Sequence, residues 1–205
     1  MRYTGPKFKL CRREQVDLFG SQKYSVKKNR ALPGQHGANM QRSSEYGKLL
    51  RNKQVLKRSY GLSEKQFVKI VKVTAAQYSK NHDITHDFAL FQFLERRVDS
   101  VVYRAGFAKT MMQARQMVSH GHFSINGQKH TVPSTFLMPG DKLTLKKNLN
   151  NSPLYTQIAE FKGKIPSWIK VDKNAYGIEL VTLPQLGEIA VNADIIKVIE
   201  FYARV

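Results

Sequence analysis

The sequence predicts an α+β fold in which helical regions are followed by a small antiparallel sheet. Three observations support this prediction: helical hydrophobic spacing begins at residue 43, a helix-turn-helix pattern covers residues 94–120, and strand-like alternation begins at Phe123. The chain has 205 residues, which is enough for one or two domains with a substantial core.

Residues 1–42 form a basic segment with little regular pattern. Gly5-Pro6, Gly20 and the stretch PGQHG at 33–37 interrupt it, so we expect a loop-rich structure with a short helix around Arg12–Phe19. A segment of this kind buries little apolar surface alone, and we expect part of it to become ordered only on a partner.

Two helices are predicted to follow. Apolar side chains recur at helical spacing from Tyr46 to Tyr60, and Gly61 ends this first helix. Ser63 and Gln66 then form a capping box, which begins the second helix. The inward stripe of the second helix consists of Phe67, Ile70, Val71, Thr74 and Tyr78.

The composition changes across residues 81–85, so we place a domain boundary near residue 86. A helix-turn-helix pattern follows this boundary. The apolar face of its first helix is formed by Leu94, Val98, Val101, Val102 and Ala105. The opposite face is expected to carry Arg97 and Arg104, and Gly106 is a natural stop.

The second helix of this pattern begins with another capping box, formed by Thr110 and Gln113. Its inward positions are Ala114, Met117 and Val118. Arg115 and Ser119 are therefore expected to point outward, and Gly121 ends the helix.

Alternating apolar residues predict strands in the remainder of the chain. Phe123 and Ile125 lead into Asn126-Gly127, which is a strong hairpin signal. Further predicted elements are a strand at Lys142–Lys146, a helix at 153–163, strands at Trp168–Val171 and Ile178–Leu183, and a buried terminal helix at 192–204. The β-branched content of that last segment leaves a strand open as the alternative.

The charge of the chain is its most unusual bulk property. Thirty-four Lys and Arg stand against fifteen Asp and Glu, which gives a formal net charge of +19 and a pI near 10.1. Residues 1–80 contain 19 of these cations against four carboxylates, whereas residues 81–205 contain 15 against 11. Such an excess indicates a polyanionic partner, although a solvated basic surface is the simpler alternative.

A membrane surface is a second polyanion, but two observations argue against a membrane partner. No stretch approaches the roughly 18 apolar residues of a spanning helix. The N-terminus is basic and lacks the apolar core of a signal peptide. We therefore expect a cytoplasmic protein with no membrane partner.

Residues that could carry chemistry are few. The single cysteine, Cys11, excludes an internal disulfide and fits a reducing compartment, and its basic surroundings are expected to favour the thiolate. His120, His122 and His130 could form a metal cluster, but no carboxylate or cysteine completes it, and solvated or RNA-facing histidines explain them better. The sequence contains no P-loop, GxGxxG or GxSxG motif, and its carboxylates look like ordinary surface partners. We predict no reaction, no cofactor and no bound metal.

The basic helix-turn-helix points instead to nucleic acid. A helix N-terminus exposes N–H groups that suit a phosphate oxygen, and Thr110 begins such a helix beside Lys109 and Arg115. Arg97 and Arg104 would complete a concave basic surface. The second helix carries few base-reading side chains for a DNA major groove, so recognition of RNA by shape and phosphates fits better. Further candidate contacts in this region are Ser119, His120 and Lys129.

Residues 94–128, LERRVDSVVYRAGFAKTMMQARQMVSHGHFSINGQ, resemble the alpha-L RNA-binding motif. Four other blocks narrow the resemblance to the bacterial form of the small-subunit ribosomal protein four family. These blocks are RYTGPKFKLCRREQVDLF at 2–19, PGQHGA at 33–38, EYGKLLRNKQVLKRSYG at 45–61 and VIEFYAR at 198–204. The resemblance runs from end to end in the same order, and it is loose only from about 147 to 190.

The resemblance implies a helical N-terminal domain that the C-terminal segment completes, with the alpha-L domain inserted between them. We therefore divide the chain into a loop-rich segment (1–42), a helical domain (43–86, completed by 192–205) and an alpha-L domain with a sheet extension (87–191). The resemblance also implies a ribosome-bound protein that binds the five-prime domain of small-subunit rRNA, nucleates subunit assembly and contributes to translational accuracy. Its implied partners are ribosomal protein five and mRNA near the entry channel, and no homo-oligomer is expected.

The RNA contacts of the family carry over to matching positions. The basic N-terminal segment matches at Arg2, Lys7, Lys9, Arg12 and Arg13. The loop matches at Gln35, His36 and Gly37, and the first long helix matches at Lys48, Arg51, Lys53, Gln54, Lys57 and Arg58. The alpha-L face matches at Arg104, Thr110, Arg115 and His120.

The sequence departs from the family at two of these sites. Met111 stands where arginine usually follows the threonine, so one phosphate contact of the family is not expected here. Lys109 stands where the family is often apolar, and we expect it to supply a nearby charge. Some relatives bind zinc through four N-terminal cysteines, whereas this chain has Cys11 only.

Two other classes of function remain as alternatives. An RNA-modifying enzyme can use an alpha-L unit as a handle, but residues 1–86 are too basic and too loop-rich for a catalytic domain. A DNA-binding regulator is the second alternative, and a preference for duplex DNA over folded rRNA would identify it.

Overall fold

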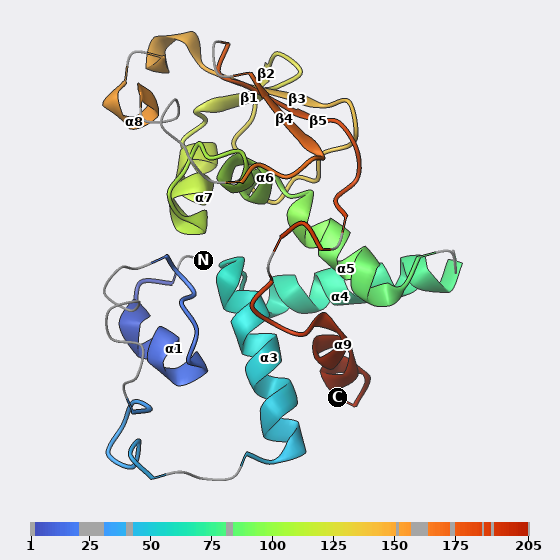
Figure 1. Ribbon diagram of the computed structural model, residues 1–205. Coiled ribbons are helices and arrows are strands. Elements are labelled where there is room, and N and C mark those ends of the chain that lie inside the picture. Colours follow the sequence, from blue (N-terminus) through green and yellow to red (C-terminus); the bar gives the residue numbers. More distant parts are fainter. Residues whose placement is uncertain are drawn as a thin grey trace. The chain divides into compact units, whose positions relative to one another are not determined.

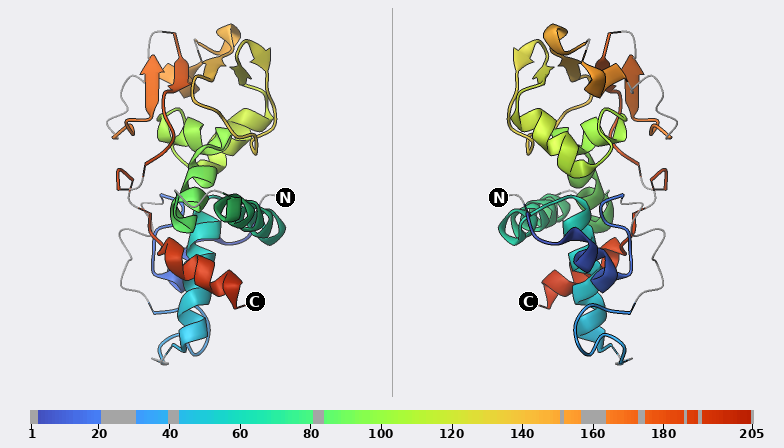
Figure 2. Two further views of the ribbon diagram at one scale, coloured as in Figure 1. Left: turned by 90° about the vertical axis from the view of Figure 1, so that its right-hand side faces the viewer. Right: turned by 90° about the vertical axis from the view of Figure 1, so that its left-hand side faces the viewer.

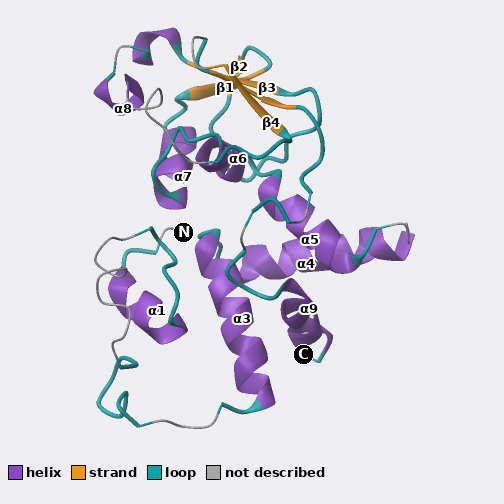
Figure 3. Ribbon diagram, in the orientation of Figure 1, coloured by secondary structure: helices purple, strands orange, loops and turns teal. Residues whose placement is uncertain are grey.

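The computed structural model describes residues 3–20, 31–39, 43–80, 84–150, 152–156, 164–172, 175–185, 187–189 and 191–204. The chain forms two compact units: unit 1 comprises Met1–Leu90 with Ala190–Val205, and unit 2 comprises Phe91–Ile189. In the described part of the chain, unit 1 is helical and the strands belong to unit 2 (Figures 1 and 3). The predicted α+β class is confirmed.

Unit 1 is built on two long helices, α3 (Glu45–Ser59) and α4 (Glu64–Lys80). Gly61 follows α3 with a φ of +60°, a left-handed conformation that glycine adopts without strain. The predicted capping box begins α4, since Gln66 N donates to Ser63 Oγ at 3.4 Å and Ser63 N donates to Gln66 Oε1 at 3.3 Å. Local sequence signals therefore set the end of α3 and the beginning of α4.

The predicted inward stripe of α4 is correct for four of its five members. Phe67, Ile70, Val71 and Thr74 are buried. Tyr78 is 39% exposed, and its ring stacks on His86 with centroids 5.9 Å apart. The prediction that Tyr78 points into the core is therefore wrong.

The C-terminal segment forms a helix rather than a strand. Asp194 caps α9 (Ile195–Ala203) by accepting a hydrogen bond from Ile196 N at 3.1 Å. The helix lies along α3, where the rings of Phe201 and Tyr46 have centroids 5.5 Å apart (Figure 2). The end of the chain therefore completes the core of unit 1.

The N-terminal helix lies earlier than predicted. Residues Lys7–Glu14 form α1, which ends where Gln15 adopts a left-handed φ of 57°. The predicted helix around Arg12–Phe19 is therefore wrong beyond Glu14. Buried Cys11, Leu18 and Val55 form a small apolar cluster that joins α1 to α3.

Unit 2 places two short helices on one side of an antiparallel sheet (Figures 1 and 2). The helices are α6 (Val98–Arg104) and α7 (Met111–Ser119). The strands are β1 (Phe123–Ile125), β2 (Gln128–Lys129), β3 (Lys142–Leu145), β4 (Ile169–Asp172) and β5 (Gly177–Leu180). They form a five-stranded sheet in the order β2-β1-β3-β5-β4. Two smaller elements, η1 (Lys147–Leu149) and α8 (Pro153–Thr156), follow β3.

Turn chemistry and alternation fix the register of this sheet. Asn126 and Gly127 both have positive φ values, 49° and 85°, as the predicted two-residue hairpin requires. Leu143 of β3 lies opposite Ile125 of β1 and Ile178 of β5. The predicted strands are confirmed except at residues 181–183, because the strand predicted at Ile178–Leu183 ends at Leu180. The predicted helix at 153–163 is seen only as α8, because residues 157–163 lie outside the described part.

One predicted helix is broken. The expected common face from Leu94 to Ala105 is divided between α6 and the preceding α5 (His86–Glu95). At the break, Arg97 forms an isolated β-bridge with Phe136, and Leu137 N donates to Arg96 O at 2.9 Å. A neighbouring segment thus pairs with backbone groups that a continuous helix would have used, and helical spacing no longer predicts where Arg97 points.

Candidate nucleic-acid interface

The start of α7 has the predicted cap, with one difference. Thr110 Oγ1 accepts a hydrogen bond from Gln113 N at 3.1 Å, which confirms the cap. Gln113 Oε1 accepts a hydrogen bond from Lys109 N at 2.8 Å, one residue earlier than in a regular capping box. The backbone of Lys109 is therefore fixed at a helix N-terminus, where the helix dipole favours an anion.

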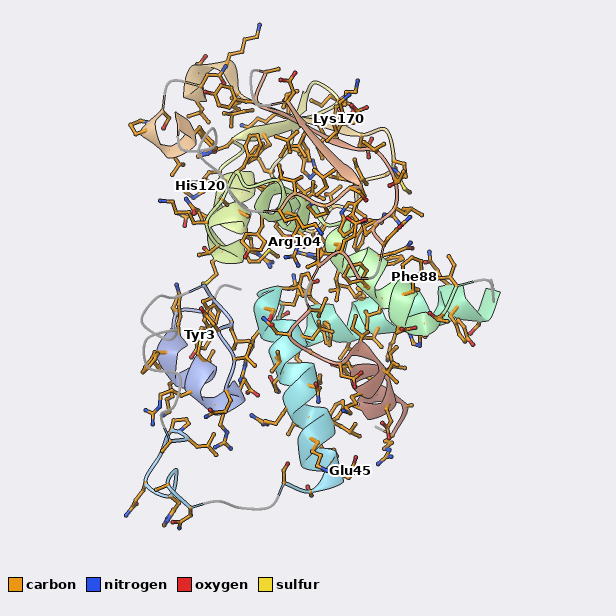
Figure 4. All side chains as sticks on the ribbon, viewed as in Figure 1. Tyr3, Glu45, Phe88, Arg104, His120 and Lys170 are labelled. Atoms are coloured by element: carbon orange, nitrogen blue, oxygen red, sulfur yellow. The ribbon has the colours of Figure 1, made fainter. Side chains whose placement is uncertain are left out.

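Polar side chains surround α7 on the outside of unit 2. Lys109, Ser119, His120 and Lys129 are exposed, whereas Thr110 and Arg115 are partly buried. Figure 4 shows His120 and Arg104 on the helical layer of this unit and Lys170 on its sheet. The exposed positions match the predicted surface, and their contact with RNA stays a prediction.

Arg97 does not belong to this surface. Its side chain is 2% exposed, and its Nε and Nη2 donate to the two carboxylate oxygens of Asp99 at 3.0 and 2.7 Å. The break between α5 and α6 turns the guanidinium into the core. The prediction that Arg97 points outward is therefore wrong, and its contact with RNA stays a prediction that this burial does not support.

Arg104 and Arg115 are partly exposed, and each lies against a buried carboxylate. Arg104 Nε and Nη2 donate to Glu95 at 3.0 and 2.7 Å, and the Glu95 side chain is fully buried. Arg115 Nη1 lies 3.7 Å from Asp99 Oδ2. Burial lowers the pKa of Arg115 and the charge of Asp99 opposes that shift, so this guanidinium stays cationic at neutral pH.

The first cations of unit 1 lie on α1. Lys7, Lys9 and Arg13 are exposed. Arg12 instead donates from Nε and Nη2 to the carbonyl oxygen of Ala31 at 3.1 and 2.7 Å. Arg12 therefore holds the following loop, which is a role that its spacing did not predict. Arg2, another predicted contact, lies outside the described residues.

The loop at residues 31–39 turns tightly around Gly37. Gly37 N donates to Gly34 O at 3.2 Å. A Cβ atom at residue 37 would lie 1.8 Å from the carbonyl oxygen of Leu32, so a larger residue does not fit without moving the backbone. This turn leaves the side chains of Gln35 and His36 exposed.

Two arginines of α3 share one buried carboxylate. Arg51 Nη1 lies 2.9 Å from Glu14 Oε1, and Arg58 Nη1 contacts the same oxygen. The Glu14 side chain is fully buried, whereas that of Arg51 is 37% exposed. Both arginines therefore join α3 to α1 and still reach the surface.

Lys53 and Lys57 contact a second carboxylate. Lys53 Nζ lies 2.8 Å from Glu64 Oε1 and 4.6 Å from the centroid of the Phe201 ring, and its side chain is buried. The RNA contact at Lys53 stays a prediction, and this burial does not support it. Lys57 Nζ lies 2.7 Å from Glu64 Oε2. Burial raises the pKa of Glu64, but hydrogen bonds from Lys53, Lys57 and Tyr202 outweigh burial and lower it to about 2.

The two remaining candidates on α3 differ in environment. Lys48 is exposed, and its Nζ lies 3.3 Å from Glu45 of the preceding turn. Gln54 is partly buried, and its Oε1 has no hydrogen-bond partner within the described part of the chain. Lys48 therefore fits the predicted surface better than Gln54 does.

The histidines of unit 2 have separate partners. His122 Nδ1 lies 2.7 Å from Tyr155 Oη, and His130 Nε2 lies 2.8 Å from the carbonyl oxygen of Val132. Burial lowers the pKa of His122, as do the nearby His120 and Lys146. Among the residues that the structure describes, no group of three His, Cys, Asp or Glu side chains could hold a metal ion.

Cys11 is not the activated thiol that its basic neighbours predicted. It is 1% exposed, and burial, together with the charge of Asp17, raises the pKa of its thiol. The expectation of a thiolate is therefore wrong, because desolvation outweighs the backbone hydrogen bonds that lower the pKa of this thiol.

The sequence also missed residues that shape the interface. Glu14, Glu95 and Asp99 were expected to be surface partners, but all three are buried against arginines. A carboxylate among cations on an otherwise apolar stripe was the available signal. Exposed cations on α4, which the sequence did not single out, are Lys65, Lys69 and Lys72.

No helix within the described ranges is both long and apolar enough to cross a membrane. Two family descriptions match the chain: "Ribosomal protein S4/S9 N-terminal domain" at residues 2–95 and "S4 domain" at residues 96–143. Similar proteins named "Small ribosomal subunit protein uS4" occur in Thermoanaerobacter sp. (strain X514), at 37% identity over 99% of both chains, and in Persephonella marina, at 40% identity over 98% of both chains. Another, in Geotalea uraniireducens, is 36% identical over 99% of both chains. The chain therefore belongs to the uS4 family of small ribosomal subunit proteins.

Proposed function

We propose that this chain is a structural component of the small ribosomal subunit, and that it binds the rRNA through exposed cations on both units. The observation that carries this proposal is the set of exposed polar side chains around α7, above all Lys109 beside its capped N-terminus and His120 at its C-terminal end. The uS4 family consists of structural ribosomal proteins, so the chain is not an enzyme.

The finer assignment is binding to the five-prime domain of small-subunit rRNA, early enough to nucleate assembly of the subunit. Exposed cations on α1 and exposed Lys109 just before α7 support it, because they offer phosphate contacts from both units. Contacts with ribosomal protein five and with mRNA near its entry channel, and an effect on decoding accuracy, belong to the same proposal and rest on the family resemblance.

The experiment is a binding titration of the full chain with a transcript of the five-prime domain, repeated between 50 and 200 mM salt. Neutralisation of roughly 6–10 phosphates predicts an affinity loss on the order of a thousand-fold or more across that range. Duplex DNA serves as the competitor. A flat salt profile, or a preference for duplex DNA, would contradict the proposal.

Matched variants separate a defined interface from net charge. Lys109→Ala is expected to weaken binding and to lower the salt slope by about one phosphate contact. Lys170→Ala removes the same charge from an exposed position on β4 and should change the slope much less (Figure 4). Equal losses from both variants would show that only net charge matters.

A further inference from the structure

Glu95 is a buried carboxylate in unit 2 that pairs with partly exposed Arg104. Its side chain is fully buried, and it accepts two hydrogen bonds from Arg104. Taking a carboxylate out of water is costly, and a buried ion pair is often no more stable than apolar residues of similar size. A buried pair of this kind is therefore weak evidence for a role in stability.

The geometry of the pair fixes the orientation of Arg104. A guanidinium is planar and carries five N–H donors in a rigid fork. Because Nε and Nη2 both donate to Glu95, the opposite edge of the group points away from the carboxylate. The Tyr103 ring adds a second restraint, with its centroid 5.5 Å from Arg104 Cζ.

The two side chains of the pair also differ in their exposure to solvent. Glu95 lies fully inside, whereas the Arg104 side chain is 23% exposed. A phosphate oxygen approaching from solvent would therefore meet the guanidinium first. An arginine that is ordered on folding loses less conformational freedom when it binds, which strengthens each contact it makes.

Buried carboxylates also lie beside two other partly exposed arginines, but with less restrictive contacts. Arg51 Nη1 lies 2.9 Å from one oxygen of Glu14, and Arg115 Nη1 lies 3.7 Å from Asp99, which accepts its hydrogen bonds from Arg97. Of these three arginines, Arg104 is the one with a two-point pair.

We propose that Glu95 is a positioning residue for RNA binding, which holds the Arg104 guanidinium so that its outer edge meets a phosphate oxygen. Glu95 itself does not contact the RNA. This inference rests on the rRNA-binding function proposed above.

The positioning role is tested by the direction in which RNA affinity changes when the negative charge of Glu95 is removed. Glu95→Gln removes a negative charge, so long-range electrostatics alone predict tighter binding to a polyanion. Positioning predicts the opposite: affinity for the five-prime-domain transcript about tenfold lower, as for the loss of one charge-assisted contact, and a smaller salt slope. Glu179→Gln is the matched control, since Glu179 pairs with exposed Lys142 at 3.7 Å, and it should bind equally or more tightly.

A double-mutant cycle excludes a general structural effect. In an Arg104→Ala background, Glu95→Gln should have no further effect on affinity, because the group that it positions is gone. Arg104→Lys keeps the charge but cannot make the two-point pair, so it should bind about tenfold more weakly than the wild type. The fluorescence of Trp168 in unit 2 reports whether Glu95→Gln folds. If that variant does not fold, Arg104→Lys tests the proposal in its place.

The outcomes separate the two proposals. Failure of the wild-type chain to bind the transcript overturns the proposed function, and this inference with it. If the wild type binds, any one of three results overturns the positioning role alone. These results are wild-type affinity in Glu95→Gln, wild-type affinity in Arg104→Lys, or a Glu95→Gln effect on affinity that is as large in the Arg104→Ala background as in the wild type.

Discussion

Asp99 and Arg97 form a two-point ion pair inside unit 2, with nitrogen–oxygen distances of 3.0 and 2.7 Å and side chains that are 1% and 2% exposed. Ser100 N also donates to Asp99 Oδ1 at 3.1 Å. The pair lies at the break between α5 and α6, where backbone groups pair with the segment around Phe136. Asp99 thus stabilises the break, and its Oδ2 also lies 3.7 Å from Nη1 of partly exposed Arg115.

Removal of Asp99 should destabilise unit 2 strongly. Asp99→Ala leaves a buried guanidinium without its counter-ion, which costs about 3–5 kcal/mol in the free energy of unfolding. Urea denaturation followed by Trp168 fluorescence measures this loss, because Trp168 is the only tryptophan and is buried in unit 2. Glu179→Gln, which breaks an exposed pair, should cost less than about 1 kcal/mol. Similar losses in the two variants would contradict the buried pair.

Acid should weaken unit 1 through Glu64. Its pKa is lowered to about 2 from an ordinary value of 4.5, so the unfolded state binds the proton more readily. The stability that this group contributes is complete above pH 4.5 and is lost as the pH falls from 4.5 toward 2. Glu64→Gln should lower stability at pH 7 and flatten this pH dependence.

Helicity measured by circular dichroism across that pH range provides the test. The fluorescence of Trp168 serves as the internal control, since this residue lies in unit 2 whereas Glu64 lies in unit 1. An unchanged acid profile in Glu64→Gln would show that the carboxylate is not the group responsible.

The thiol of Cys11 should react slowly in the folded protein. Burial raises its pKa and shields it from solvent, and both effects suppress attack on an alkylating reagent. Iodoacetamide at pH 7 should modify the native chain far more slowly than the chain in denaturing urea, and mass spectrometry gives both rates directly because Cys11 is the only cysteine. Comparable rates in the two conditions would mean that the apolar cluster with Leu18 and Val55 does not cover the thiol.

Local signals predicted most of the fold because they act within a few residues. The caps at Ser63 and Thr110 and the hairpin at Asn126-Gly127 all appear where the sequence placed them. These features depend on backbone geometry and on hydrogen bonds between near neighbours, which the sequence displays directly.

The candidate site was harder to predict because contacts with residues far along the chain decide which of its cations are buried and which are exposed. Helical periodicity placed Arg97 outside, but the segment around Phe136 breaks the helix and turns it inward. Lys53 is buried because Glu64 of α4 and Phe201 of α9 converge on it, 11 and 148 residues further along the chain. Charge counting identifies a polyanion-binding chain, but only tertiary contacts tell which cations remain at the surface.

Replacement of Gly37 should affect RNA binding without unfolding either unit. In Gly37→Ala the new Cβ would lie 1.8 Å from Leu32 O, so the loop at residues 31–39 must change its backbone path. The exposed side chains of Gln35 and His36 would move with it. If this loop contacts rRNA, affinity for the five-prime-domain transcript should fall roughly tenfold or more.

Ala38→Ser is the matched control, because residue 38 is exposed and the substitution adds one hydroxyl to an existing Cβ. It should bind as the wild type does, and both variants should keep the wild-type thermal unfolding profile because the loop contributes little to either core. Lower affinity in Gly37→Ala with an unchanged unfolding profile would separate a role in recognition from a role in stability. Wild-type affinity in Gly37→Ala would remove Gln35, His36 and Gly37 from the proposed interface, since the clash makes the original loop geometry impossible.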